Sequence, residues 1–320
     1  MVSVIIPIYN GEQYIKKCLD SLHLDKNISL EVIAVNDGSK DGSSALLHEY
    51  AKQYTNLKVI DKENQGSAQA RFDGIAAASG DFIAFLDVDD YVESDIYTKM
   101  EEKATQAGAD IVVCDYIEEY PARSVPVKNV FDGKQEELIK GEDVIRHLHH
   151  RTAIFPYPWN KLYRASLLRQ VQFPTGNFVG EDYNMLLQLF SMTDRTAYLE
   201  QFGYHYVLTE NSVSRRGYTP ATALAYEHFK EDYAWVCEKY PHMERDVTHY
   251  LMTEYMAIVI SMGRNKTYDK KMIKEIKRFV KKGLFGFLRA NYVPVKMKGS
   301  AVALCISYRL LIFMYRILSK

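Results

Sequence analysis

Three aspartates within four positions, Asp87, Asp89 and Asp90, are the most informative residues of the 320-residue chain. They follow an apolar run, Phe82–Leu86, that is typical of a buried strand. Carboxylates this close repel one another and are costly to hold at a strand end without a nearby cation. Their oxygens suit Mg²⁺ or Mn²⁺, and Mg²⁺ commonly lies between carboxylates and a substrate phosphate. The alternative, that Asp89 and Asp90 cap the next helix, is less favoured because other polar strand ends are expected beside them.

Four further apolar runs have strand character: Val2–Ile6, Leu30–Val35, Leu57–Ile60 and Ile111–Cys114. Continuous apolar runs are typical of parallel strands buried on both faces, and amphipathic helical stretches separate the first four runs along the chain. This alternation predicts an α/β fold with a doubly wound sheet. Ligands bind such sheets at the carboxyl ends of the strands, where Pro7–Asn10, Asn36–Gly42 and Asn64–Gly66 are expected to join the aspartates.

Six segments, taken together and in this order, resemble one enzyme family: Val2–Asn10, Val35–Gly42, Asn64–Arg71, Ala84–Tyr91, Trp159–Tyr163 and Gly180–Asp182. The sequence is similar to the inverting, family 2 nucleotide-sugar glycosyltransferases of bacterial capsule, teichoic-acid and cell-wall polysaccharide synthesis. The resemblance covers residues 1–215 and is densest over 1–95. It implies the GT-A fold, which is Rossmann-like with a mostly parallel, doubly wound sheet, and it implies metal-dependent transfer from a UDP-sugar to a glycan or lipid-linked glycan.

The resemblance assigns the nucleotide-sugar to Pro7, Tyr9, Asp37, Asn64, Arg71, Asp87 and Val88. Asp37 would accept the uracil N3–H, because a carboxylate only accepts hydrogen bonds, and Tyr9 would cover the base. Arg71 would reach the base edge or the diphosphate, unless it is a surface arginine on an amphipathic helix. Asp87 would face the ribose and the sugar.

The same resemblance assigns the catalytic base to Asp182, with Glu181 as the rival that otherwise orients the acceptor hydroxyl. Two acids at a helix start are also ordinary partners of the helix dipole. Asp89 would bind the divalent metal, and Asp90 would cap a helix or support its neighbours. His205 would either complete the metal site or be packed and hydrogen-bonded in a strand.

The acceptor side is expected at Trp159, Asn160 and Lys161, although Trp159 also suits a core position. A loop with Ser212, Ser214 and Arg215 would either close on the diphosphate or be an ordinary surface loop. We therefore divide the first 215 residues into a nucleotide-binding half, 1–115, and an acceptor-binding half, 116–215.

The formal net charge of −1 hides an uneven distribution. From Ser261 to Lys320 there are 15 Lys/Arg and 2 acids, a net charge of +13, so the rest of the chain carries −14. Residues 216–320 are predicted to form a helical, basic C-terminal region. Segment 301–318 is apolar but contains Arg309 and Arg316, which suits a helix lying at an interface. An anionic membrane surface is the favoured partner of residues 266–320, ahead of a helical bundle or homo-oligomer, with nucleic acid disfavoured.

Composition narrows the remaining alternatives. A hydrophobic fraction of 47% and a charged fraction of 25% exclude a disordered chain. No Gly-x-Gly-x-x-Gly follows the first strand, which disfavours a dinucleotide-dependent oxidoreductase. A nucleotidyltransferase acting on sugar phosphates and a non-catalytic carbohydrate-binding or scaffold protein stay open as alternative functions.

The four dispersed cysteines and the absence of a signal-like N-terminus predict a cytoplasmic protein. Together with the basic C-terminal region, they predict a peripheral position on the inner face of the membrane. His147, His149 and His150 are expected to be solvated.

Overall fold

The computed structural model describes residues 1–26, 29–129, 138–172, 180–208 and 217–318. The chain forms two compact units. Unit 1 comprises Met1–Ile145, Ala153–Asn177 and Glu181–Thr209, and unit 2 comprises Arg146–Thr152, Phe178–Gly180 and Glu210–Lys320. No local sequence pattern indicates that Arg146–Thr152 belongs with unit 2, and the division of the chain at 115 and 215 stays a prediction.

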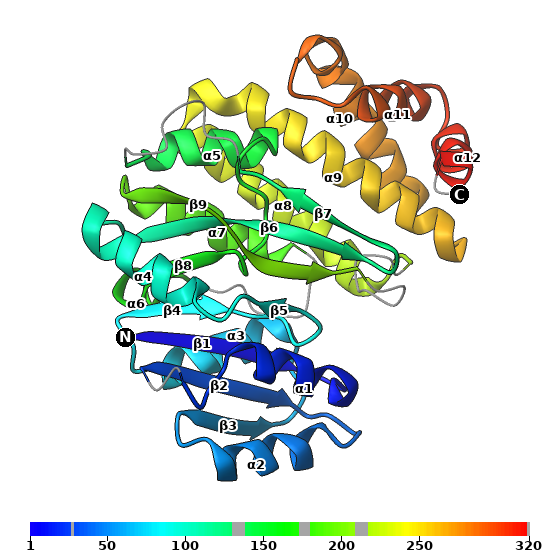
Figure 1. Cartoon of the computed structure of the whole chain (residues 1–320). Coiled ribbons are helices and arrows are strands. Elements are labelled where there is room, and N and C mark those ends of the chain that lie inside the picture. Colours follow the sequence, from blue (N-terminus) through cyan, green and yellow to red (C-terminus); the bar gives the residue numbers. More distant parts are fainter. Residues whose placement is uncertain (27–28, 130–137, 173–179, 209–216, 319–320) are drawn as a thin grey trace. The chain divides into compact units, whose positions relative to one another are not determined.

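Unit 1 is built on a nine-stranded sheet in the order β3-β2-β1-β4-β8-β6-β9-β5, with β7 paired to β6 (Figure 1). The strands are β1 Val2–Ile8, β2 Leu30–Asp37, β3 Leu57–Lys62, β4 Phe82–Phe85, β5 Tyr91–Val92, β6 Ile111–Tyr120, β7 Arg123–Val127, β8 Lys161–Arg164 and β9 Thr196–Val207. β1, β2, β3 and β4 are parallel, as their apolar runs predict. The short strand β8 is antiparallel and joins β4 to β6, whose pairing with β9 is again parallel. The predicted doubly wound α/β fold is confirmed.

The helices of unit 1 connect these strands: α1 Glu12–Ser21, α2 Ser43–Gln53, α3 Ser67–Ala77, α4 Ile96–Ala107, α6 Ala165–Leu168 and α7 Glu181–Met192, with α5 Gly141–His150 ending in unit 2. α3 packs closely on β1 because Gly74 faces Ile5. A Cβ at Gly74 would lie 2.4 Å from Cγ2 of Ile5, so a larger residue would push the helix away. This close approach fixes the position of the other residues of α3, including Arg71.

Unit 2 is helical, as the sequence predicts, with α8 Pro220–Lys239, a short 3₁₀ turn Pro241–Met243, α9 Glu244–Asn265, α10 Lys270–Arg289, α11 Val295–Ile306 and α12 Tyr308–Leu318. The apolar segment 301–318 is not one helix, because Ser307 is extended and separates α11 from α12. Within the described residues, no helix combines the length and hydropathy that crossing a bilayer requires. The prediction that the histidines of α5 are solvated is wrong for His149, which is buried, and for His150, whose side chain is 16% exposed and stacks on Tyr292.

Candidate active site

The carboxyl ends of β1, β2 and β4 lie side by side, because the three strands are parallel neighbours in register. The segments after β1 and β2 are tied together by Asn10. Its backbone N–H donates to Ser39 Oγ at 2.9 Å, and its side-chain oxygen accepts from the Lys40 N–H at 2.8 Å. Tyr9, immediately before it, is half-exposed. The polar segments that follow these strands therefore lie together at the carboxyl ends of the strands.

Asp37, at the end of β2, organises the loop that leads into α3. Its carboxylate accepts from the backbone N–H groups of Gln65 and Gly66, at 2.9 and 2.8 Å, and from Lys62 Nζ at 3.2 Å. Asn64 donates from its side chain to the Asp37 carbonyl at 2.9 Å. Asp37 is buried, and these hydrogen bonds hold the loop in place. Its contact with a nucleotide base stays a prediction.

The aspartates after β4 have three different environments. Asp90 is buried and accepts from Tyr204 Oη at 2.6 Å and from the Val207 N–H at 2.7 Å, so it anchors β9. It caps no helix, because α4 begins only at Ile96; of its two expected roles, the structure shows the second, which is to support neighbouring residues. Asp87 bonds to an arginine of α3. Burial, and next the charge of Asp87, raise the pKa of Asp89 to about 6.

Arg71 of α3 is the centre of the site. Its Nη1 donates to Asp182 at 2.9 Å and its Nη2 donates to Asp87 at 3.0 Å. The Arg71 side chain is 7% exposed, whereas those of Asp87 and Asp182 are about 30% exposed. One buried guanidinium thus fixes two partly accessible carboxylates from different elements. Arg71 is therefore not the surface arginine considered as its alternative from sequence, and its contact with the base or the diphosphate stays a prediction.

The start of α7 contacts α3 twice. Ser67 Oγ donates to Glu181 at 3.0 Å, one helical turn before the Arg71–Asp182 pair. Burial raises the pKa of the Asp182 carboxyl, the charge of Arg71 opposes this shift, and Glu181 and Asp87 add to it. The sequence shows that Ser67 and Arg71 are four residues apart on one helix face and that Glu181 and Asp182 are adjacent. It does not show that these two pairs contact each other.

His205 lies in β9 in the packed environment that was one of its two expected alternatives. Its Nδ1 lies 2.8 Å from Glu119 Oε1, its Nε2 lies 3.1 Å from Glu93 Oε1, and its ring stacks on Tyr91. Both ring nitrogens are therefore engaged by carboxylates. In the part of the chain that the structure describes, no three His, Cys, Asp or Glu side chains form a metal-binding group.

The expected acceptor-side residues are all buried. Trp159 stacks on Tyr204 with ring centroids 4.3 Å apart, which is the core position considered from sequence. Lys161 Nζ donates to the Tyr157 carbonyl at 2.6 Å and to Asn160 Oδ1 at 2.7 Å, and burial lowers the pKa of Lys161 to about 7. These residues hold the segment 155–161 in place. Ser212, Ser214 and Arg215 lie outside the described residues.

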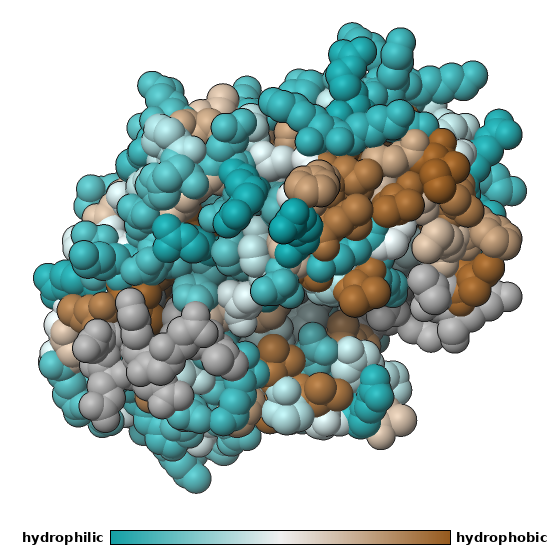
Figure 2. Space-filling view, turned by 90° about the horizontal axis from the view of Figure 1, so that it is seen from above, coloured by the Kyte–Doolittle hydropathy of each residue, from teal (hydrophilic) through white to brown (hydrophobic). Residues whose placement is uncertain are grey.

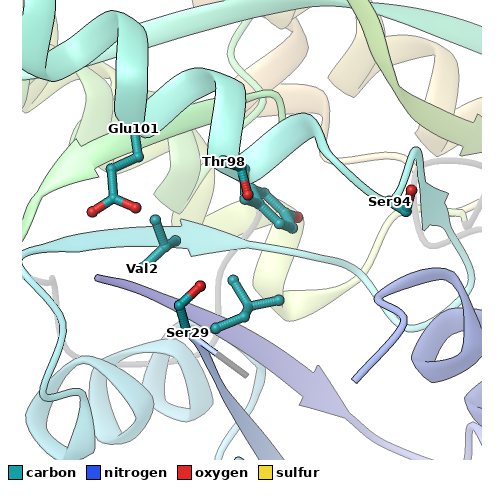
Figure 3. A pocket seen from close by; sticks show the side chains of 7 residues that line it. Val2, Ser29, Ser94, Thr98 and Glu101 are labelled. Carbon is teal, nitrogen blue, oxygen red and sulfur yellow. The ribbon is translucent and has the colours of Figure 1, made fainter. Parts of the chain in front are cut away.

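A small cavity lies at the opposite, amino ends of β1 and β2 (Figure 3). It is lined by Val2, Ser29, Leu30, Ser94, Tyr97, Thr98 and Glu101. Its volume of about 10 Å³ holds about one water molecule. It is therefore too small for a substrate.

The sheet with aspartates after its parallel strands, and with the base candidate Asp182 tied to one of them through Arg71, is the arrangement that the resemblance to nucleotide-sugar glycosyltransferases predicts. The family model described as Glycosyl transferase family 2 matches residues 3–172, which is more than half of the chain, so this chain belongs to glycosyltransferase family 2. The fold is the GT-A fold, and the family predicted from sequence is confirmed.

Relatives and solved structures agree with this assignment. The uncharacterized glycosyltransferase EpsJ of Bacillus subtilis is 33% identical over 246 residues, covering 76% of this chain and 70% of EpsJ. The poly(ribitol-phosphate) beta-glucosyltransferase of Bacillus spizizenii is 29% identical, covering 65% of this chain and 32% of that protein. The S. aureus TarS 1-349 structure in complex with UDP-GlcNAc has a TM-score of 0.60 at 19% identity, covering 98% of this chain and 91% of that one. Alignment with GlyA of Streptococcus pneumoniae spans only 31% of that relative.

Proposed function

We propose that this chain transfers a sugar from a UDP-sugar to a hydroxyl of a glycan or lipid-linked glycan, with inversion and with a divalent metal. The observation that carries the proposal is the Arg71 bridge between Asp87 and Asp182. Asp87 follows β4, where the donor is expected, and Asp182 begins α7. The bridge therefore sets a donor-side carboxylate and a base candidate at a fixed separation, which a direct displacement requires.

Asp182 acts as the general base. It takes the proton from the acceptor hydroxyl as that oxygen attacks the anomeric carbon and the bond to the diphosphate breaks. The reaction inverts the anomeric carbon because it is a single displacement. A raised pKa suits this task, because a base works best when its pKa lies near the working pH. Glu181, held by Ser67, orients the acceptor hydroxyl.

The surroundings of Asp89 indicate whether this residue could bind the metal. Among the described residues, no other residue donates a hydrogen bond to its carboxylate, and its raised pKa reflects burial beside Asp87. Such a group fits a cation that one or two carboxylates share with a diphosphate, and it does not fit a metal cage made by protein alone. Mn²⁺ or Mg²⁺ bound there would neutralise charge on the departing nucleoside diphosphate. Because both nitrogens of His205 contact glutamates, we assign it no metal contact.

The donor is proposed to be a UDP-sugar because the TarS structure of similar fold was solved with UDP-GlcNAc. In this proposal Pro7 and Tyr9 line the base pocket, and Asp37 with Asn64 shape the loop beside it. Val88 packs against Gly11, where a Cβ would lie 3.1 Å from a Val88 methyl group, so the start of α1 stays close to the aspartates.

The acceptor class follows from the relatives. One is a poly(ribitol-phosphate) beta-glucosyltransferase, and a succinoglycan biosynthesis protein of Rhizobium meliloti is 28% identical. We therefore place this chain in cell-surface polysaccharide synthesis. Family membership disfavours the nucleotidyltransferase and scaffold alternatives.

The C-terminal helices support a peripheral position on the cytoplasmic face of an anionic membrane. α10, α11 and α12 expose seven large apolar side chains: Phe285, Leu288, Val295, Val302, Ile306, Phe313 and Ile317. Figure 2 shows apolar and hydrophilic residues side by side on the right of the view, the side on which these helices lie in Figure 1. Apolar side chains interleaved with cations are typical of interfacial helices.

Vesicle co-sedimentation tests this position. The variant Phe285→Ser/Ile306→Ser/Phe313→Ser should pellet less with anionic vesicles than wild type does. Leu224→Ser, at an exposed apolar residue of α8, is the control and should pellet like wild type. Equal pelleting of all three proteins would contradict the membrane proposal.

A panel of nucleotide-sugars, with and without EDTA and read out as released nucleoside diphosphate, tests the enzymatic proposal. We expect one UDP-sugar to be consumed with inversion, and we expect EDTA to abolish the release. Asp89→Ala should remove the EDTA-sensitive activity. Release that is unaffected by EDTA would overturn the metal, and consumption of a GDP-sugar alone would overturn the donor.

A further inference from the structure

Unit 2 contains a cavity of about 360 Å³ between α8, α9 and α10 that no step of the proposed reaction uses. It is lined by Tyr226, Lys230, Tyr233, Tyr255, Glu275, Arg278, Phe279 and Lys282. Its volume lies in the range of about 300–1,000 Å³ that is usual for ligand sites. All of its lining belongs to one unit.

The aromatic residues form a continuous surface in this cavity. Tyr255 lies 5.1 Å from both Tyr226 and Phe279, and Phe279 lies 5.7 Å from Tyr233, measured between ring centroids. Tyr226 and Tyr255 are buried, while Tyr233 and Phe279 are half-buried. Rings arranged in this way offer apolar faces to a flat or ring-shaped ligand.

The charges of the cavity are unbalanced. Lys230 lies over the Tyr226 ring and 3.6 Å from Glu275, which also accepts from Tyr226 Oη at 3.0 Å. Arg278 and Lys282 are exposed and, within the described residues, have no ion-pair partner. Three cations and one acid leave the lining with a charge of +2. Glu275, Arg278, Phe279 and Lys282 recur at helical spacing on α10, so one helix face presents both features.

We infer that this cavity binds a sugar that carries a phosphate, with the sugar ring on the aromatic surface and the phosphate on Arg278 and Lys282. A neutral sugar would leave the cations without a partner, and inorganic phosphate would leave the aromatic surface uncovered. The ligand reaches the protein either as part of a phosphate-containing glycan or as a lipid-linked sugar phosphate. The identification of this ligand as part of the acceptor rests on the proposed function. The existence of the binding site does not depend on the proposed function.

Saturation-transfer NMR on the full chain, with UDP present to occupy the donor site, tests the inference. The probe is glucose 1-phosphate, compared with glucose and with inorganic phosphate. Arg278→Ala/Lys282→Ala should weaken binding of glucose 1-phosphate by about tenfold or more, because two charge-assisted contacts are lost. The matched control is Lys274→Ala/Lys281→Ala, which removes the same charge from exposed positions of the same helix outside the cavity and should bind like wild type.

Equal weakening in the two double variants would overturn the site, because it would reflect net charge alone. Glucose binding as tight as that of glucose 1-phosphate would overturn the phosphate contact. Binding of a single-stranded oligonucleotide that depends on Arg278 and Lys282, without binding of glucose 1-phosphate, would also overturn it. Parallel pelleting with anionic vesicles identifies the source: a loss specific to the cavity variant supports a lipid-linked ligand, and equal pelleting supports a glycan. UDP affinity is measured separately. A protein that binds glucose 1-phosphate but not UDP would contradict the proposed function and leave this site standing.

Discussion

Two charge clusters, one in each unit and each built around one buried charged side chain, differ in their balance of charge. In unit 1, Arg71 bonds to both Asp87 and Asp182, Glu181 lies next to them, and the charge of Lys161 also acts on Asp182. In unit 2, Asp246 lies 3.9, 3.1 and 3.5 Å from Arg146, His150 and Arg245. Burial raises the pKa of Asp182 against the charge of Arg71, and the neighbouring acids Glu181 and Asp87 add to the rise. Burial raises the pKa of Asp246, but the hydrogen bond from His150 and the neighbouring cations have the larger effect, so the pKa is lowered.

The difference separates a reactive cluster from a structural one. Asp182 and Asp87 are partly accessible, and their mutual repulsion is relieved when a proton or a cation arrives. Asp246 is buried, and its charge is satisfied inside the fold, where it joins α5 to α9. We therefore expect substitutions in the first cluster to change catalysis and substitutions in the second to change stability.

The largest effect is expected for Asp182→Asn. Loss of the general base should lower transfer by about 10²–10⁴-fold while UDP binding stays near wild type, because the amide keeps the shape of the side chain but accepts no proton. Single-turnover release of UDP in the presence of acceptor measures the rate, and calorimetry measures UDP binding. Near-normal transfer would move the role to Glu181, for which Glu181→Gln is the companion variant.

Asp246→Asn should have the opposite signature. Removing the acid takes a buried acceptor from the half-buried His150 and a counter-ion from two partly exposed arginines, so the free energy of unfolding should fall by about 1 kcal/mol, as for one lost hydrogen bond. Transfer at a temperature where the variant is folded should match wild type. Chemical denaturation and the UDP-release assay check the two parts. A selective loss of transfer in a stable variant would break the distinction between the clusters.

Asp37→Ala should weaken donor binding by about tenfold, because the N–H groups of Gln65 and Gly66 lose their acceptor and the loop before α3 loosens. Titration with UDP measures the affinity. Asp194→Ala is a suitable control, since Asp194 also accepts from a backbone N–H, that of Gly141 at 3.0 Å, but precedes β9 and lies outside the polar segments that follow the parallel strands. Wild-type affinity in Asp37→Ala would contradict the proposed donor pocket.

The smallest effect concerns acid sensitivity of unit 2. Burial, together with the charge of Arg245, lowers the pKa of His249 to about 4. Its pKa is therefore below the unfolded value of about 6.5, so the unfolded chain binds the proton first and stability falls as the pH drops from about 6.5 to about 4. Calorimetry should show a smaller decrease for His249→Gln than for wild type. His242→Gln, at an exposed histidine, should keep the wild-type slope.

Local pattern predicted the parallel strands and their polar ends, because continuous apolar runs and the residues that follow them are visible in a few neighbouring positions. The Arg71–Asp182 contact spans 111 residues and depends on how closely α3 packs at Gly74, which no local pattern records. β8 was missed because it is four residues long and contains a buried lysine. His149 was misplaced for a similar reason: the burial of one helix face depends on its tertiary neighbours.

The pH profile of transfer by Arg71→Lys tests the central claim most directly, namely that one buried arginine couples the donor-side aspartate to the base. Lysine keeps the charge but loses the two-pronged geometry. Because Arg71 holds the pKa of Asp182 down, weakening this contact should move the acidic limb of the kcat profile to higher pH and lower the plateau. Transfer should fall while the affinity for UDP changes little. An unchanged acidic limb, with transfer and stability falling together, would contradict the coupling and leave Arg71 a structural residue.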